Sequence, residues 1–102
     1  MNYRVAKVIV LEARKWFDKV NGNTYHSVCV DVVFDDFSRE TYTVGQTYGY
    51  SNVYRETAIE VLKKNGVFGS ENINLSRECQ DRGIVFIEIC NNVLKRDLHI
   101  SN

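Results

Sequence analysis

A strict alternation of residue types over residues 24–34 is the feature that most constrains the fold of this chain. Successive side chains of a β-strand point to opposite faces, so a period of two predicts a strand with one buried face. The expected buried face comprises His26, Val28, Val30, Val32 and Phe34, and the expected opposite face comprises Tyr25, Ser27, Cys29 and Asp31.

Turn signals predict a further strand on either side of this one. Asn21-Gly22-Asn23 precedes it, and both Asn and Gly tolerate the positive φ of a hairpin loop. Asp35-Asp36 follows it and begins a second turn. Residues 3–17 and 39–44 are therefore expected to form the flanking strands of an antiparallel meander, with one face open to a covering helix.

The covering helix is expected to follow Ser51-Asn52, either of which can cap it, and to end near Asn65. Gly66 is placed for a left-handed C-cap, which glycine adopts without steric cost. The expected buried stripe of this helix consists of Tyr54, Ala58, Val61 and Leu62.

The C-terminal third of the chain is less regular. Residues 69–82 are polar, and Ser76 is expected to cap a short helical turn that ends at Gly83. Residues 84–90 form an apolar run that predicts a strand. Asn91-Asn92 is expected to form a two-residue hairpin turn, with a last strand returning over residues 93–100.

These elements predict one α+β domain over residues 1–102, with an antiparallel sheet in the order β-β-β-α-β-β and one main helix packed on one face. Within it, residues 1–67 form the strand meander and the helix. Residues 68–102 are expected to form a loop followed by a strand or hairpin.

The composition disfavours several classes of protein. Lys plus Arg and Asp plus Glu number 13 each, so no overall charge draws the chain to nucleic acid or to a membrane. Three cysteines without C-x-x-C spacing predict neither a disulfide framework nor a zinc site, and a reducing cytoplasm fits them best. No apolar run reaches the roughly 18 residues of a membrane span. We therefore expect no metal, no cofactor and no membrane association.

No catalytic motif is present in the sequence. His26 and His99 are the only histidines, and neither belongs to a spaced carboxylate or cysteine motif. The chain has no G-x-x-x-x-G-K-[ST] loop, no H-E-x-x-H and no G-x-S-x-G. We expect a protein that acts by binding and not as an enzyme.

Tyrosines and glycines gather over residues 41–54, which hold four of the six tyrosines and two of the six glycines. Strand alternation and the helix stripe assign Tyr42 and Tyr54 to the core. Other tyrosines remain available for recognition, because tyrosine offers apolar area with a polar tip and is enriched in interface hot spots. The predicted partner-binding surface comprises Trp16, Tyr25, Tyr48 and Tyr50.

Three other interactions stay open. Arg14, Lys15, Trp16 and Lys19 mix cations with an aromatic ring, a combination with which single-strand binders hold phosphates and stack bases. The glycine–tyrosine turn is a weaker candidate for a nucleotide or small-ligand site. The long apolar first strand could also pair through its edge with a second copy of the chain, giving a homodimer.

Three short motifs in this chain resemble motifs of small uncharacterised proteins of tailed bacteriophages. They are R-K-W-F at residues 14–17, G-N-T-Y-H-S-V at residues 22–28 and T-Y-G-Y at residues 47–50. In that family a similar strand–turn–strand leads into a Y-G-Y-G-like turn and a helix that contains T-A and a leucine, which Thr57-Ala58 and Leu62 match here. Ser51 stands where the family pattern has its second glycine.

The resemblance covers residues 13–67 and brings no established activity with it. It implies a phage accessory protein that works in the cytoplasm of an infected bacterium. Small phage proteins of this kind often act on host factors. The leading hypothesis is therefore binding and inhibition of a host bacterial protein, such as an antiviral defence factor.

Overall fold

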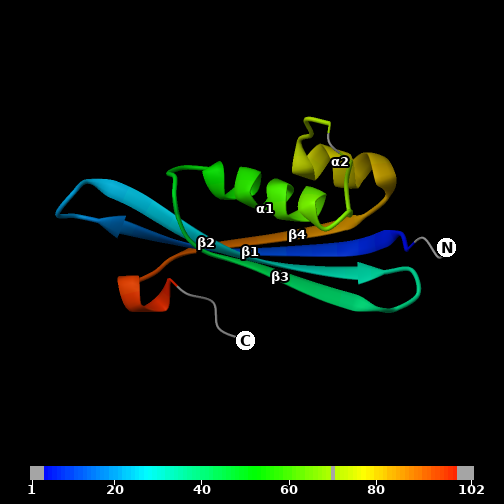
Figure 1. Cartoon of the computed structure of the whole chain (residues 1–102), viewed down its shortest axis with the longest axis horizontal. Helices are drawn as coiled ribbons and strands as arrows, with labels where there is room; N and C mark the ends of the chain where they lie inside the picture. Colours follow the sequence, from blue (N-terminus) through cyan, green and yellow to red (C-terminus); the bar gives the residue numbers. More distant parts are fainter. Residues whose placement is uncertain (1–3, 70, 99–102) are drawn as a thin grey trace.

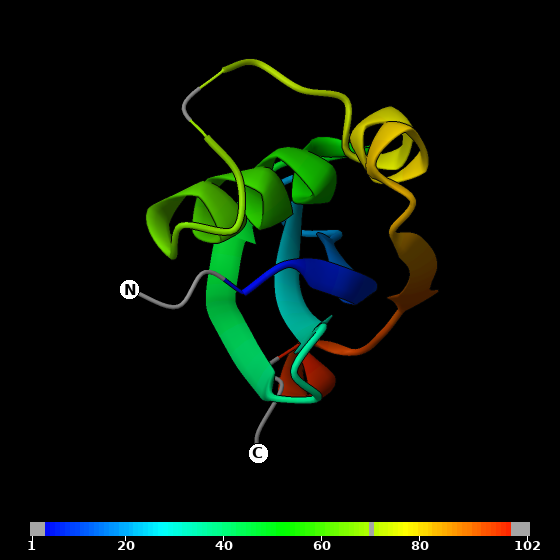
Figure 2. The same cartoon turned by 90° about the vertical axis from the view of Figure 1, so that its right-hand side faces the viewer.

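The described strands form one four-stranded sheet in the order β3-β2-β1-β4, and two of the described helices cover one of its faces (Figures 1 and 2). The computed structural model describes residues 4–69 and 71–98. Its elements are β1 (Ala6–Asp18), β2 (Asn23–Phe34), β3 (Arg39–Tyr48), α1 (Val53–Lys64), α2 (Leu75–Arg82), β4 (Val85–Asn92) and the 3₁₀ helix η1 (Lys95–Asp97). The predicted α+β class is confirmed, and β1, β2 and β3 form the predicted antiparallel meander.

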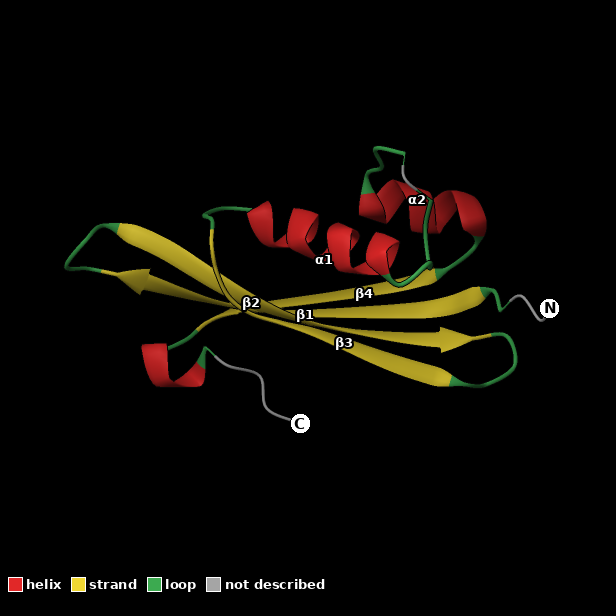
Figure 3. Ribbon diagram, viewed as in Figure 1, coloured by secondary structure: helices red, strands yellow, loops and turns green. Residues whose placement is uncertain are grey.

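The alternation in β2 determines which face of the sheet is buried. His26, Val28, Val30, Val32 and Phe34 are all buried beneath the helices, as predicted. In β1 the same face carries Ile9, Leu11 and Ala13, and a register irregularity between Ala6 and Val8 leaves Val5 half-exposed outside it. Figure 3 shows α1 lying along this face, where it packs on β2 and β3.

The ends of α1 follow the sequence signals. The helix begins at Val53, directly after Asn52, although the Asn52 side chain makes no capping hydrogen bond. At the other end Gly66 has φ 77°, and the Val67 amide donates to the Leu62 carbonyl at 2.9 Å. This is the left-handed C-cap that the glycine predicts.

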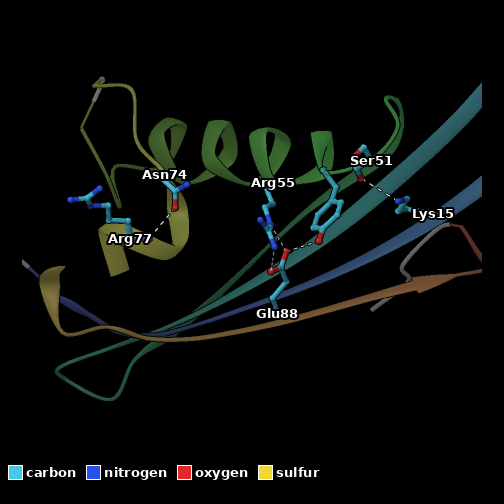
Figure 4. A network of polar contacts seen from close by, with 7 residues as sticks. Lys15, Ser51, Arg55, Asn74, Arg77 and Glu88 are labelled. Atoms are coloured by element: carbon cyan, nitrogen blue, oxygen red, sulfur yellow. Dashed lines mark hydrogen bonds and ion pairs between the residues drawn. The ribbon is translucent and has the colours of Figure 1, made fainter. Parts of the chain in front are cut away.

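The second helix is longer than predicted and begins at a different cap. Asn74, not Ser76, is the N-cap residue of α2, and its side-chain oxygen accepts from the Arg77 amide at 3.1 Å (Figure 4). Placing the cap two residues earlier gives α2 eight residues in place of a single turn. Gly83 ends the helix with φ 70°, as predicted.

The direction of β4 corrects the predicted topology. β4 pairs with β1 in parallel, Leu11 lying opposite Glu88, so the sheet is mixed and not wholly antiparallel. The chain crosses the sheet through α1 and α2 before β4 begins, and such a crossover returns it to the end of the sheet where β1 starts. The sequence pattern of residues 84–90 carries no information about this direction.

The predicted hairpin at Asn91-Asn92 is also wrong. Both residues belong to β4, where they pair with Arg14 and Lys15 of β1. The Val93 amide then donates to the Lys15 carbonyl at 2.8 Å, so the chain continues in the same direction and enters η1. The described part of residues 93–100 contains this 3₁₀ helix and no fifth strand, while residues 99–102 lie outside the described residues.

The edge of the first strand is not available to a second copy in the way predicted. β1 lies inside the sheet, with β2 on one side and β4 on the other over residues 8–15. A homodimer through that stretch is therefore excluded. The outer strands of the sheet are β3 and β4.

A charged contact joins α1 to β4 beneath the helix layer. The Glu88 carboxylate accepts from the Tyr54 hydroxyl at 2.5 Å and from Arg55 Nε and Nη2 at 2.6 and 2.7 Å (Figure 4). The Arg55 guanidinium holds the pKa of Glu88 below its usual range. Burial, followed by the Glu88 carboxylate, raises the pKa of Tyr54 to about 12. All three groups therefore keep their charge states across the neutral range, and β4 stays joined to α1.

The cap of α2 can be tested by paired substitutions. We expect Asn74→Ala to lower the free energy of unfolding by about 1 kcal/mol, because it removes the side chain that accepts from the Arg77 amide in the first turn of this helix. Ser76→Ala, at the exposed position that the sequence pattern favoured, serves as the matched control. It should change the free energy of unfolding by about 0.5 kcal/mol at most. Urea denaturation followed by circular dichroism measures both, and a larger loss for Ser76→Ala would show that the cap is misplaced.

Candidate functional site

Three aromatic side chains form a row across three strands at one end of the sheet. Trp16 of β1 lies opposite Tyr25 of β2, which lies opposite Tyr48 of β3. The rings of Trp16 and Tyr25 stack with centroids 5.7 Å apart and planes inclined by 20°. Those of Tyr25 and Tyr48 meet edge to face at 5.8 Å and 75°. We call Trp16, Tyr25 and Tyr48 the aromatic row.

The aromatic row lies on the face of the sheet opposite α1 and α2. Side chains alternate along a strand, so Trp16 points away from the side on which Leu11 and Ala13 are buried. Tyr25 is likewise adjacent in sequence to the buried His26 and points the other way. The rings therefore contribute little to the main core, and their stacking fixes them relative to one another at the surface.

The C-terminal segment supports the row from the same face. η1 lies on the side of the sheet away from the helices (Figure 1), and Lys95 places its ammonium 5.5 Å from the centre of the Trp16 ring. Arg14 Nη1 donates to the Asp97 carbonyl at 3.0 Å, and the Ser27 hydroxyl donates to the carbonyl of the fully buried Leu98. These contacts hold η1 against the β1–β2 hairpin.

Tyr48 and Tyr50 are the exposed members of the predicted partner-binding surface. Their exposed fractions are 59% and 65%, whereas Trp16 and Tyr25 are half-buried. Among the described residues, Tyr50 makes no ring contact with the row. The structure thus brings three of the four predicted partner-binding residues together and places Tyr50 two residues beyond Tyr48, after Gly49.

Gly49 positions both tyrosines because it sits against the buried His26. The Gly49 amide donates to the Thr24 carbonyl at 3.0 Å, and the Gly49 carbonyl accepts from His26 Nδ1 at 3.3 Å. A Cβ at Gly49 would lie 2.7 Å from Val53 Cγ1 and 3.1 Å from His26 Cε1. Only glycine fits here without displacing the start of α1, which explains the T-Y-G-Y sequence at this corner.

His26 is a structural residue held in its neutral form. Nδ1 donates to Gly49, so Nε2 is the acceptor for the Thr57 hydroxyl at 2.7 Å. Burial lowers the pKa of His26 below its ordinary value. The imidazole links β2, the glycine–tyrosine corner and α1, and both ring nitrogens are engaged within the protein.

An apolar pocket of about 430 Å³ adjoins the row, where the β1–β2 hairpin extends past the end of β4. Trp16, Phe17 and Val20 line it from the hairpin, and Val93 and Leu94 line it from the segment after β4. The pairing of β1 with β4 ends at Lys15. On the β4 side, the last three residues of β1, Trp16 to Asp18, therefore border the pocket, and none of the described strands pairs with them there.

Val93, Leu94 and Lys95 were not predicted as parts of this site, because their sequence pattern favoured a returning strand. The break from the apolar Val93-Leu94 pair to the charged Lys95-Arg96-Asp97 run was the available signal. It marks the point where the chain stops pairing with β1 and turns onto the other face of the sheet.

The cations of the predicted nucleic-acid site are not gathered on one surface. Lys15 points to the helix side and donates to the Ser51 carbonyl at 3.2 Å (Figure 4). Arg14 points to the opposite side and forms an ion pair with Glu12 at 3.3 Å. Lys19 lies in the exposed turn after β1 and lines the pocket. These contacts satisfy Arg14 and Lys15 internally and separate them by the thickness of the sheet.

Groups with catalytic or metal-binding potential are scarce in the described part of the chain. Residues 4–69 and 71–98 contain no cluster of three His, Cys, Asp or Glu side chains that could hold a metal ion. Burial raises the pKa of the Cys79 thiol to about 11 and also raises that of Cys29. Cys90 is exposed. Neither described helix is long and apolar enough to cross a membrane.

We expect Gly49→Ala to lower the free energy of unfolding by about 1–3 kcal/mol, because the added methyl group forces Val53 or His26 to move. Gly69→Ala is the matched control, since a Cβ at Gly69 meets nothing within 4 Å. Chemical denaturation measures the difference between the two variants. Equal stabilities would show that the corner is not tightly packed.

Stability should depend on pH through His26. Its pKa is lowered on folding, so its contribution is fully present above the unfolded pKa of about 6.5 and decreases as the pH falls below that value. We expect the free energy of unfolding to decrease between pH 7.5 and pH 5.5. His26→Gln should flatten this change. An unchanged slope in His26→Gln would contradict the assignment.

Comparison with known proteins gives no match to this chain, whether with family models, with curated proteins or with solved structures.

Proposed function

We propose that this protein acts by binding another protein through the aromatic row, Tyr50 and the adjoining pocket. The observation that carries the proposal is the contact between three aromatic rings, drawn from three strands on the sheet face away from the main core, beside an apolar pocket. Tyrosine and tryptophan are the side chains most enriched in interface hot spots. Rings already fixed by stacking lose little conformational entropy when a partner docks.

The shape of the pocket favours a partner that presents a short extended segment. The free side of β1 at residues 16–18 borders the pocket, so it offers backbone groups beside an apolar cavity. An added strand could pair there and place an apolar side chain between Phe17 and Leu94, as in other cases of β-strand addition. Tyr48 and Tyr50 would then contact the surface that flanks this segment.

The proposed partner is a host bacterial protein, and the proposed outcome is its inhibition or modulation, an antiviral defence factor being the leading target. The resemblance to phage proteins supports this origin. Its three motifs contain Trp16, Tyr25, Tyr48 and Tyr50, the residues gathered at this end of the sheet. The proposed place of action is the cytoplasm of the infected bacterium.

Affinity purification from lysate of the host bacterium tests the proposal. We expect the tagged protein to retain a specific host protein, and Tyr48→Ala combined with Tyr50→Ala to reduce its recovery at least tenfold, because the two exposed rings supply contact area. Both side chains are exposed, so the double variant should remain folded. Mass spectrometry identifies the retained protein.

Phe37→Ala is the matched control for this experiment. Phe37 is 91% exposed and belongs to the turn between β2 and β3. Figure 1 shows this turn at the opposite end of the sheet from the β1–β2 turn. The Phe37→Ala variant should retain the partner fully. Equal recovery with the tyrosine variant would count against the proposed surface. Binding of single-stranded oligonucleotides with a steep salt dependence would instead support nucleic acid as the ligand, and a ligand-induced thermal shift would support a small molecule.

A further inference from the structure

β4 is an outer strand whose exposed side carries an apolar stripe. Val85, Ile87 and Ile89 point to the face opposite the helices, with exposed fractions of 56%, 46% and 46%. Within the described residues no strand pairs with the outer edge of β4, so alternate backbone amides and carbonyls along it have no ladder partner. Val8 and Val10 of β1 extend the stripe inward.

β4 lacks the charged residues that discourage strand pairing at the other edge of the sheet. Its only charged residue is Glu88, which points to the helix side and is bound by Arg55 and Tyr54. The opposite edge, β3, carries Arg39 and Glu40, and its other exposed residues are Thr41, Thr43, Gly45, Gln46 and, at its end, Tyr48. Charged residues discourage edge pairing, and apolar uncharged edges promote it.

We propose that two copies of this chain pair through β4, antiparallel and about a twofold axis at Ile87, to form a continuous eight-stranded sheet. In this register Ile87 lies opposite Ile87 of the second copy, and Val85 lies opposite Ile89. The stripe is therefore complementary to itself: each of its three side chains meets an apolar side chain across the axis.

The charges fit this pairing as well. The register places each Glu88 opposite Phe86 of the second copy, so the two carboxylates are offset along the strands, and each already has Arg55 as its counter-ion. The chain has 13 basic and 13 acidic residues, so two copies carry no net charge that would repel them. Pairing the two β4 edges therefore leaves no charged side chain of β4 without a counter-ion.

The dimer interface is separate from the proposed partner-binding surface. The aromatic row belongs to β1, β2 and β3, and the pocket includes only Asn92 from β4, whereas the stripe spans residues 85–89 on the outer edge. Pairing through β4 would therefore leave both copies of the row exposed. The inference does not depend on the identity of any host partner.

Sedimentation velocity over 1–100 µM tests the dimer. We expect the wild-type protein to reach the mass of two chains, and Ile87→Lys to sediment as a monomer, because two lysines would meet at the axis. Val20→Lys is the matched control: Val20 is 92% exposed in the β1–β2 turn, and its replacement should leave the dimer intact. Tyr48→Ala combined with Tyr50→Ala should also remain dimeric. A wild-type protein that is monomeric throughout this range overturns the proposal.

A cross-link tests the register. In a Cys90→Ser background, Ile87→Cys would place two thiols across the axis, where directly opposite Cα atoms lie about 4.5–5.5 Å apart and suit a disulfide. We expect mild oxidation to convert most of this variant to a covalent dimer. The Cys90→Ser parent alone should stay uncross-linked, since Cys29 and Cys79 are buried. Failure of Ile87→Cys to cross-link overturns the proposed pairing.

Discussion

The parallel pairing of β4 with β1 is the constraint on which the other features depend. It encloses β1, whose Ile9, Leu11 and Ala13 are buried, within the sheet. It also ends at Lys15, three residues before β1 does, and this difference in length creates the apolar pocket beside Trp16. Because β4 runs in the same direction as β1, its C-terminal end delivers η1 to the hairpin, where Lys95 reaches the Trp16 ring.

Local patterns in the sequence predict the local structure well. The alternation in β2 correctly identifies His26 and Val28 as buried, and Gly66 and Gly83 end their helices in the left-handed conformation. What the sequence does not reveal is the outcome of competition between distant segments. Asn91-Asn92 favours a turn when considered alone, but pairing with Arg14 and Lys15 satisfies its backbone and keeps the strand extended.

The same distinction applies to the candidate site. Trp16 and Tyr25 could be assigned to one sheet face, because strand alternation and the hairpin register follow from the sequence. The pocket could not be predicted, since it depends on where β4 stops. The separation of Arg14 from Lys15 follows from alternation alone and could have been predicted, whereas the contacts that engage them, with Asp97 and Ser51, required the positions of η1 and α1.

The two faces of the sheet carry different kinds of information. Leu11 and Val30 on one face specify how the chain folds, whereas Trp16 and Tyr48 on the other specify what its surface displays. Substitutions at alternate positions along one strand can therefore change the exposed face while leaving the hydrophobic interior intact. A change in surface chemistry is thereby separated from a change in stability, so one backbone can carry many different exposed faces.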